Sequence, residues 1–285
     1  MVYVRTATLT QADGATWTLN DGRTPAGASS DWIVEDVAGW YGGSGVRGES
    51  VARLGHGDFV GRGWRETRTL TLHETIACKD SDERDWQERN LSGMVWSGEF
   101  GTLTCDDGNA VLSTGVRLDG APQIVKLGVT ALKFQIPLRA TSPFLYGEWR
   151  ESTIRPKSAG VGLEFDLFSV GGVLTYGDEI DDGAYVWNDG NALSYPQFTV
   201  TADAPGGFAV GIGGRRVVYP WPTYQDMPVV IDMAGSASIG GIDQSHRLGA
   251  RQWVGVEPSD LGTPFFDLLE GGSGFCTVRH RDTYI

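Results

Sequence analysis

The sequence predicts a mainly β protein with a single helix, and three observations support this prediction. Glycine supplies 41 of the 285 residues and proline only 12, and glycine permits the positive φ angles of tight turns. The chain also has 10 tryptophans, 9 tyrosines and 11 phenylalanines, residue types that favour strands. A helical pattern occurs in one stretch alone. Each half of the chain is long enough to bury a core of its own.

The first strands are expected near the start of the chain. Tyr3–Leu9 alternates polar and apolar residues, and Ile33–Trp40 is a second candidate strand. Between them, Asn20-Asp21-Gly22 is a turn signal, because asparagine and aspartate tolerate the left-handed backbone region and glycine adopts it freely. Gly42–Gly63 is predicted to be a long glycine-rich loop, flexible over Gly42–Gly48, with no role assigned to it.

The segment Trp64–Ile76 is predicted to be the longest strand. Alternate residues of a strand point to opposite faces of its sheet. One face is expected to hold Leu70, Leu72 and Ile76, and the other to hold Thr69, Thr71, His73 and Thr75. We therefore expect a half-buried strand with one wet face.

A helix is predicted over Asp82–Trp96. Asp80 can cap its first turn, and Glu83 follows at the spacing of a capping box. Acidic residues in the first turn also suit the helix dipole. An apolar stripe is expected from Trp86, Leu91, Met94 and Val95, and Gly98 is expected to end the helix as a left-handed cap.

Strands are expected again in the rest of the first half. Gly101–Cys105 and Ala110–Leu118 flank Asp106-Asp107-Gly108-Asn109, which predicts a hairpin. Lys126–Arg139 alternates Leu127, Val129 and Ala131 with polar partners, continues with Phe134 and Ile136, and predicts one long strand. Thr141–Ser158 has two prolines, mixed charge and no periodicity, so it is predicted to connect two domains.

The second half is predicted to contain strands alone. Gly213-Gly214 is the two-residue signature of a hairpin between Phe208–Ile212 and Arg215–Tyr219. Further strands are expected at Pro228–Met233, Gln252–Val256 and Phe275–Arg279. Several short strands joined by turns predict a β-sandwich.

The charge and the cysteines exclude several classes of protein. A formal net charge of −13 argues against binding to nucleic-acid phosphates or to an anionic membrane surface. No apolar run reaches the ~20 residues of a membrane span, and the N-terminus lacks a signal-peptide pattern. Cys78, Cys105 and Cys276 form no C-x-x-C pair, which favours a reducing environment. Cys78 and Cys276 are expected to be packed thiols.

Motifs of catalysis and cofactor binding are incomplete. Gly43–Gly48 matches G-x-G-x-x-G, but the residues after it are not helical in period, as a dinucleotide site requires. Gly271–Phe275 lacks the closing glycine of a nucleophile elbow. The four histidines are not spaced as zinc ligands on a helix, and His73 and His280 are expected on the polar faces of strands. The histidines are His56, His73, His246 and His280. We therefore expect no catalytic, cofactor-binding or metal-binding residues.

Two features keep a second interpretation open. The acidic run Asp178–Gly183 fits a solvated loop, or a calcium site that lacks the twelve-residue spacing and its distal glutamate. The tryptophans of the second half fit packing roles, or sugar stacking on a sandwich surface. They are Trp149, Trp187, Trp221 and Trp253, of which Trp221 stands between two prolines.

The second half, from Thr141 to Ile285, contains an ordered series of small motifs. They are Thr141–Gly147, Gly171–Gly177, Asn188-Asp189-Gly190-Asn191-Ala192, Tyr195–Val200, Met227–Asp232 and Arg281–Ile285. This order resembles the C-terminal half of the phage distal tail proteins, siphophage tail components that build a ring at the tip of a bacterial virus tail. The resemblance covers nearly the whole chain, and the order of the motifs carries more of it than any single motif.

The resemblance implies two domains. Residues 1–146 would form an N-terminal β-barrel or split sandwich with a helix near 82–96, and residues 147–285 a C-terminal galectin-like β-sandwich. Trp64–Ile76 followed by Asp82–Trp96 is similar to the strand-then-helix element of the first domain. No long insertion interrupts the second domain, whereas some relatives carry a carbohydrate-binding module there. The long loop Gly42–Gly63 is a departure from the family pattern.

The resemblance also implies a function. The chain would be a structural virion protein of the phage tail tip, made in the cytoplasm of the host bacterium, without enzymatic activity, cofactor or membrane anchor. Six copies would form a ring that joins the tail tube protein to baseplate and fibre proteins, and DNA would pass through it without specific binding. The alternative is a carbohydrate-binding module that recognises host cell-wall sugar, and a glycosidase is a distant third.

In a six-fold ring, the loop Gly42–Gly63 and the net charge would each have an expected role. Gly42–Gly63 and the wet face of Trp64–Ile76 are the candidates for contact between subunits. Six copies would carry six times −13, or −78. We expect an acidic channel wall from the first half, which would repel DNA and keep it centred. Asp80–Glu83 and Asp106-Asp107 are possible sources of that charge; otherwise the acidic residues are spread over the outer surface for solubility.

Overall fold

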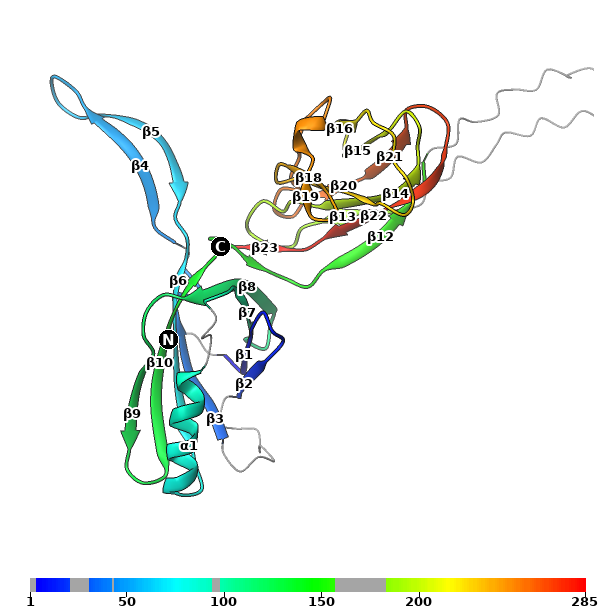
Figure 1. Ribbon diagram of the computed structural model, residues 1–285. Coiled ribbons are helices and arrows are strands. Elements are labelled where there is room, and N and C mark those ends of the chain that lie inside the picture. Colours follow the sequence, from blue (N-terminus) through cyan, green and yellow to red (C-terminus); the bar gives the residue numbers. More distant parts are fainter. Residues whose placement is uncertain (1–3, 21–30, 43, 94–97, 157–182) are drawn as a thin grey trace, which may run out of the picture. The chain divides into compact units, whose positions relative to one another are not determined.

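The computed structural model describes residues 4–20, 31–42, 44–93, 98–156 and 183–285 (Figure 1). The chain divides into two compact units. Unit 1 comprises Met1–Glu148 with Tyr284–Ile285, and unit 2 comprises Trp149–Thr283. The sequence prediction of the fold class is confirmed: the described residues are mainly β, with one α-helix and a closed, barrel-like sheet in unit 1. The galectin-like character of the second half stays an expectation from the resemblance.

Unit 1 is built on a ten-stranded sheet in the order β23-β11-β8-β7-β1-β2-β3-β6-β10-β9. An additional pairing of β8 with β10 closes seven of these strands into the barrel. Neighbours in the barrel are antiparallel, except that β2 and β3 are parallel. The strands are β1 Thr6–Thr10, β2 Thr16–Asn20, β3 Asp31–Ala38, β6 Thr69–Ala77, β7 Gly101–Asp106, β8 Val111–Leu118, β9 Gln123–Leu127, β10 Ala131–Ala140, β11 Leu145–Tyr146 and β23 Thr283–Tyr284.

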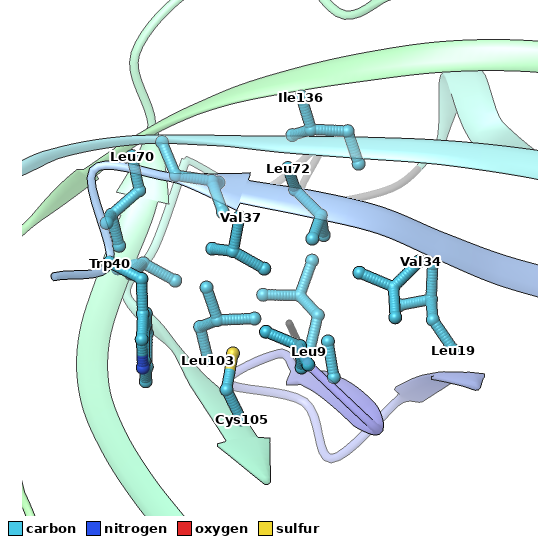
Figure 2. Close-up of a cluster of buried hydrophobic side chains, with 14 of the residues drawn as sticks. Leu9, Leu19, Val34, Val37, Trp40, Leu70, Leu72, Leu103, Cys105 and Ile136 are labelled. Atoms are coloured by element: carbon cyan, nitrogen blue, oxygen red, sulfur yellow. The ribbon is translucent and has the colours of Figure 1, made fainter. Parts of the chain in front are cut away.

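Strict alternation in these strands builds the core of unit 1. Every second residue of β6 and of β10 is buried, because one face of each strand points into the barrel. Figure 2 shows side chains from β1, β2, β3, β6, β7 and β10, with Trp40 after β3, converging on one apolar cluster. The labelled members are Leu9, Leu19, Val34, Val37, Trp40, Leu70, Leu72, Leu103, Cys105 and Ile136.

The helix α1 spans Ser81–Ser92 and begins as predicted. The side chain of Asp80 accepts hydrogen bonds from the backbone N–H of Asp82 (3.1 Å) and Glu83 (2.9 Å). The Glu83 carboxylate accepts from the N–H of Lys79 at 2.7 Å. Together these bonds satisfy donors that a helix start leaves free.

The predicted end of this helix is wrong, and its predicted apolar stripe is confirmed at Leu91 but wrong at Trp86. The helix ends at Ser92 rather than near Gly98, and Gly93 follows it in a right-handed conformation, because glycine is a poor helix former and invites termination. Trp86 is exposed, whereas the buried helical residues are Gln87 and Leu91. Met94 and Val95 lie outside the described residues.

The predicted glycine-rich loop is largely a β-hairpin, which is the main correction to the sequence analysis. Strands β4 (Val46–Ala52) and β5 (Asp58–Arg65) pair with each other and with no other described strand. Their register shifts between Gly48 and Ser50, so a bulge reverses the alternation that a sequence pattern relies on. We call Val46–Arg65 the arm. Figure 1 shows it as a long hairpin, coloured blue to cyan.

Other predicted strands also differ from the observed ones. The expected long strand Trp64–Ile76 is broken, because β5 ends at Arg65 and β6 begins at Thr69. The ten-residue β10 is the longest described strand. The strand expected over Lys126–Arg139 is two strands, β9 and β10, joined at Gly128, whose φ of 67° only glycine adopts readily.

The segment Thr141–Ser158, predicted to connect two domains, includes the boundary between the units after Glu148. It also contains two strands that the sequence analysis did not predict, β11 and β12, of which β12 pairs with β22. The strand expected at Gln252–Val256 does not form. The N–H of Gln252 bonds to Arg216 (3.1 Å) and that of Val256 to Ser194 (2.8 Å), so the segment makes isolated bonds to separate segments.

Unit 2 contains a six-stranded sheet, β12-β22-β14-β17-β18-β19, and a three-stranded sheet, β16-β15-β21, with a two-stranded pair, β13-β20. Side chains from these sheets share one apolar core, which fits the predicted sandwich. The elements are β12 Arg150–Ile154, β13 Val186–Trp187, β14 Gln197–Asp203, β15 Phe208–Ile212, β16 Arg215–Tyr219, β17 Val229–Asp232, β18 Ser236–Ile239, β19 Ile242–Asp243, the 3₁₀ turn Ser245–Arg247, β20 Leu261–Gly262, β21 Pro264–Leu268 and β22 Ser273–His280.

Candidate interaction surface

The arm exposes an unusual amount of apolar surface. Every residue of β4 and β5 is exposed. More than half of each large apolar side chain is accessible, and Leu54 near the tip is fully accessible. A hairpin of two strands is marginally stable by itself, and contiguous apolar patches on a surface mark interaction sites. The exposed residues are Val46, Val51, Leu54, Phe59, Val60 and Trp64.

The arm is also positively charged, unlike the rest of the chain. It contains four arginines and two carboxylates, a net charge of +2, which leaves −15 for all other residues. Arg53 lies 4.6 Å from the ring centre of Phe59, and Arg62 lies 4.5 Å from that of Trp64. Such cation–π pairs hold aromatic rings and charges together on one surface.

The base of the arm is fixed by a buried arginine that the sequence analysis did not single out. Arg68 is 1% exposed. Its Nη1 donates to the carbonyls of Gly39 (3.1 Å) and Trp40, and its Nε (3.2 Å) and Nη2 (2.8 Å) donate to that of Pro143. Burial lowers the pKa of this guanidinium, and the carbonyl dipoles compensate for its lost hydration.

Two further contacts fix the chain on either side of the arm. A Cβ on Gly39, whose φ is 83°, would lie 2.3 Å from the carbonyl oxygen of Thr69, so only glycine fits the turn after β3. The hydroxyl of Tyr41 donates to Asp107 Oδ2 at 2.5 Å. Burial alone would raise the pKa of Asp107, but this bond and those from the backbone N–H of Ala110 and Asn109 lower it. The arm therefore begins and ends on a rigid base.

A cleft of 510 Å³ lies at the root of the arm, beside the outward face of β6 and β10. Its charged side chains include three arginines, from β4, β5 and β10. The lining residues are Ser44, Gly45, Arg47, Trp64, Arg65, Glu66, Thr67, Thr69 and Arg139. The wet face predicted for Trp64–Ile76 thus contributes Thr69 to this cleft.

Glu74 is a second residue that the sequence analysis missed. It occupies the same face of β6 as Leu70, Leu72 and Ile76 and is fully buried, and strand alternation from Leu72 would have shown this. Neither carboxylate oxygen has a hydrogen-bond partner among the described residues. Burial raises the pKa of Glu74 well above its ordinary value, because an unpaired charge in an apolar core is costly.

The histidines are not brought together. His56 lies in the turn of the arm, His73 on the outward face of β6 and His246 in the 3₁₀ turn of unit 2. His280 was expected on a polar face but is buried, because its parity in β22 is that of Cys276 and Val278. Burial, and then Arg150, lower its pKa to about 4, against the opposing effect of Asp282. No group of three potential metal ligands occurs among the described residues.

The structure bears on the role of the tryptophans but not on the possible calcium site. The acidic residues Asp178–Asp182 lie outside the described residues. The tryptophans of unit 2 are engaged by other side chains. An arginine lies over the ring of Trp149 (Arg281, 4.2 Å, and Arg279, 4.8 Å), Trp187 (Arg150, 4.4 Å) and Trp221 (Arg247, 5.7 Å), while Trp253 packs on the core. This arrangement favours the packing interpretation over open sugar platforms.

The remaining sequence predictions concern motifs and cysteines. The glycine-rich Gly43–Gly48 leads into strand β4, where a dinucleotide site needs a helix; Gly43 itself lies outside the described residues. Cys78 and Cys276 are buried free thiols, as predicted, and so is Cys105. Within the described part of the chain, no helix is both long and apolar enough to cross a membrane.

Comparisons with known proteins point to one class of solved structure. No protein-family model and no curated protein matches the sequence. The SPP1 Dit protein, described as a paradigm of the hub adsorption apparatus in phages that infect Gram-positive bacteria, is 12% identical over 89% of this chain and 94% of its own, with a TM-score of 0.60. A chain of the phage P2 baseplate in its activated conformation is 10% identical over 97% of both chains, with a TM-score of 0.50. The chain therefore has the fold of SPP1 Dit and of this baseplate chain, and the motif order of its second half resembles phage proteins of the same kind.

Proposed function

We infer that this chain is a structural virion protein of a phage tail tip. Six copies form a ring that joins the tail tube to the baseplate and fibre proteins. The observation that carries this proposal is the extent of the fold match, which includes both units and 94% of SPP1 Dit. A match over nearly the whole of both chains supports a shared role more strongly than one shared domain would, because single domains recur in unrelated functions.

The arm supports the assembly. A ring of identical subunits needs two different, complementary patches on each subunit. The arm offers one of them: it is apolar, basic and without a partner strand other than its own hairpin among the described residues. Burying its valines, Phe59 and Trp64 against a neighbour would stabilise the ring through the hydrophobic effect. Most of the candidate contact region Gly42–Gly63 belongs to this arm, which is a β-hairpin.

The charge supports a conduit for DNA. Six copies carry −78 in total, six times −13, and concentrating this charge costs self-repulsion. An acidic channel wall would keep the duplex centred, whereas a basic wall would bind its phosphates and hold it. We propose that residues of unit 1 outside the arm provide this wall. The passing DNA is not bound specifically.

The proposal includes neither catalysis nor a cofactor. Sugar binding by unit 2 is the alternative function, but its tryptophan rings are engaged by arginines or by the core. A structural role in the virion accounts for the arm, which a carbohydrate-binding module does not need.

Electron microscopy of the purified chain, with sedimentation velocity, tests the ring. We expect six-fold rings with a central hole and a mass of six subunits, each of 30.7 kDa. A chain that stays monomeric at high concentration and is also missing from purified tail tips would contradict the proposal. Specific, saturable binding of a cell-wall polysaccharide by that monomer would favour the alternative.

A further inference from the structure

The cleft at the root of the arm holds more positive charge than its own surroundings neutralise. Three of its residues are arginines and one is a glutamate. Arg139 pairs with Asp119 outside the cleft, with 3.3 Å between Nε and Oδ1. Arg65 donates from Nη1 to the backbone carbonyl of Ser44 at 3.1 Å. The backbone of Arg47 belongs to the β4–β5 ladder, opposite Trp64, but its side chain makes no hydrogen bond or ion pair within the described residues.

Guanidinium groups that share a small space repel each other unless an anion lies between them. A carboxylate suits this position, because an arginine can donate two parallel hydrogen bonds to its two oxygens. Arg47 and Arg65 come from the arm, and Arg139 comes from β10 of the barrel. An anion held by all three would therefore also fix the arm against the barrel of its own unit.

We propose that this cleft receives a carboxylate-bearing segment of a second copy of this chain, an inference that rests on the proposed ring. Charge complementarity identifies the occupant, since the chain outside the arm carries −15. The neighbour's acidic segment enters the cleft while the apolar side chains of the arm lie against its surface. Each subunit thus contributes a basic cleft and an acidic segment, the two unlike patches that a closed ring requires.

The other anion that three arginines fit is a nucleic-acid phosphate. One feature of the lining favours a protein. Trp64, which is 58% exposed, provides apolar surface beside the arginines, as in the centre of a protein–protein interface.

Substitution of the arginines tests the cleft in the full chain. Arg47→Gln and Arg139→Gln are expected to raise the protein concentration at half-assembly about tenfold each, because an interfacial charge loses its partner. Arg47→Glu is expected to abolish assembly, and Arg47→Lys to fall between Gln and wild type, since lysine keeps the charge but not the fork. Arg216→Gln is the matched control, as Arg216 is exposed on β16 of unit 2. Sedimentation velocity between 50 and 500 mM NaCl measures assembly, and thermal melts confirm folding.

The dependence of assembly on salt concentration is an independent test of the cleft. Wild-type assembly is expected to weaken as NaCl rises, because salt screens charge pairs, and the Arg47→Gln variant is expected to respond less. The Arg47 side chain is exposed and has no partner in the described parts of the chain, so its replacement keeps the test valid even if Arg139→Gln fails to fold.

The possible outcomes distinguish a failure of the cleft proposal from a failure of the ring proposal. If the wild type forms rings and the arginine variants assemble like Arg216→Gln, the cleft proposal is overturned and the ring stands. If these variants assemble normally but lose salt-sensitive binding of double-stranded DNA, the cleft is a phosphate site and the proposal is equally overturned. A wild type that never assembles, alone or in tails, overturns the ring first and the cleft with it.

Discussion

Two hairpins of this molecule, β4–β5 and β15–β16, have opposite environments. In the arm every strand residue is exposed, whereas all five residues of β15 are buried. The difference lies in the neighbours. β15 pairs with β21 as well as with β16 and faces the core of unit 2, while β4 and β5 pair only with each other among the described strands. The apolar residues of β15 pack in the core of unit 2, whereas we propose that those of the arm pack against a neighbouring subunit.

Their turns show the same contrast. Gly213 and Gly214 have φ angles of 57° and 84°, which fit the two-residue turn that the sequence signature predicts. The arm closes with a longer turn, in which the N–H of Arg53 donates to the carbonyl of Gly57 at 3.1 Å. The tight Gly213-Gly214 turn makes the β15–β16 hairpin predictable from the sequence, whereas a longer turn and a bulge make the arm hard to predict.

Removing the arm should have the largest effect on assembly and little effect on folding. The N–H of Glu66 donates to the carbonyl of Gly45 at 2.9 Å, so the two ends of the arm are adjacent and Asn-Gly can replace residues 46–65. We expect rings and tails to be lost, because the apolar patch is gone, while the thermal midpoint changes by less than about 4 °C, the shift of roughly 1 kcal/mol. Sedimentation velocity and calorimetry measure the two effects.

The outcome would decide what the arm is for. Normal rings without the arm would show that it does not hold subunits together. Loss of cooperative unfolding would show instead that it belongs to the fold of unit 1.

A pair of phenylalanines compares the two hairpins directly. Phe208 on β15 is fully buried, and Phe59 on β5 is 62% exposed. Phe208→Ala is expected to lower the free energy of unfolding by about 3–5 kcal/mol, as a core cavity does. Phe59→Ala is expected to change it by less than about 0.5 kcal/mol but to weaken assembly. Urea unfolding measures the first effect and sedimentation the second; equal losses of stability would contradict the contrast.

Two buried titratable groups extend the comparison to pH, with the smallest expected effects. Burial raises the pKa of Glu74 in unit 1 above its ordinary 4.5. The folded state therefore holds the proton longer, and stability is lost as pH rises from about 4.5 towards the folded pKa. For His280 in unit 2, burial and Arg150 lower the pKa from 6.5 to about 4, so stability is lost as pH falls from 6.5 to about 4.

Urea unfolding between pH 4 and pH 8 tests both directions. Relative to Glu74→Gln, the wild type should lose stability as pH rises; relative to His280→Gln, it should lose stability as pH falls. A wild-type curve parallel to that of either variant would refute the shift for that residue.

The amino-acid sequence was sufficient to predict the class of the fold and several local structures. Glycine content and alternation predicted strands, the Asp80 cap predicted the start of α1, and turn signals predicted the hairpins at 106–109 and 213–214. The parity of β6 correctly assigned Leu70, Leu72 and Ile76 to the core. These features depend on residues that are close together in the sequence, so they can be predicted without knowledge of the tertiary structure.

The residues of the candidate site could be recognised only in the tertiary structure. Arg68 is buried because carbonyls from Gly39, Trp40 and Pro143 meet around it, and the cleft joins Arg47 and Arg65 to Arg139, far away in the sequence. The sequence pointed to Gly42–Gly63 as a contact region but not to its hairpin. Alternation shows which residues share a face of a strand. What covers that face depends on segments distant in the chain, and for the arm we propose that it is a neighbouring subunit.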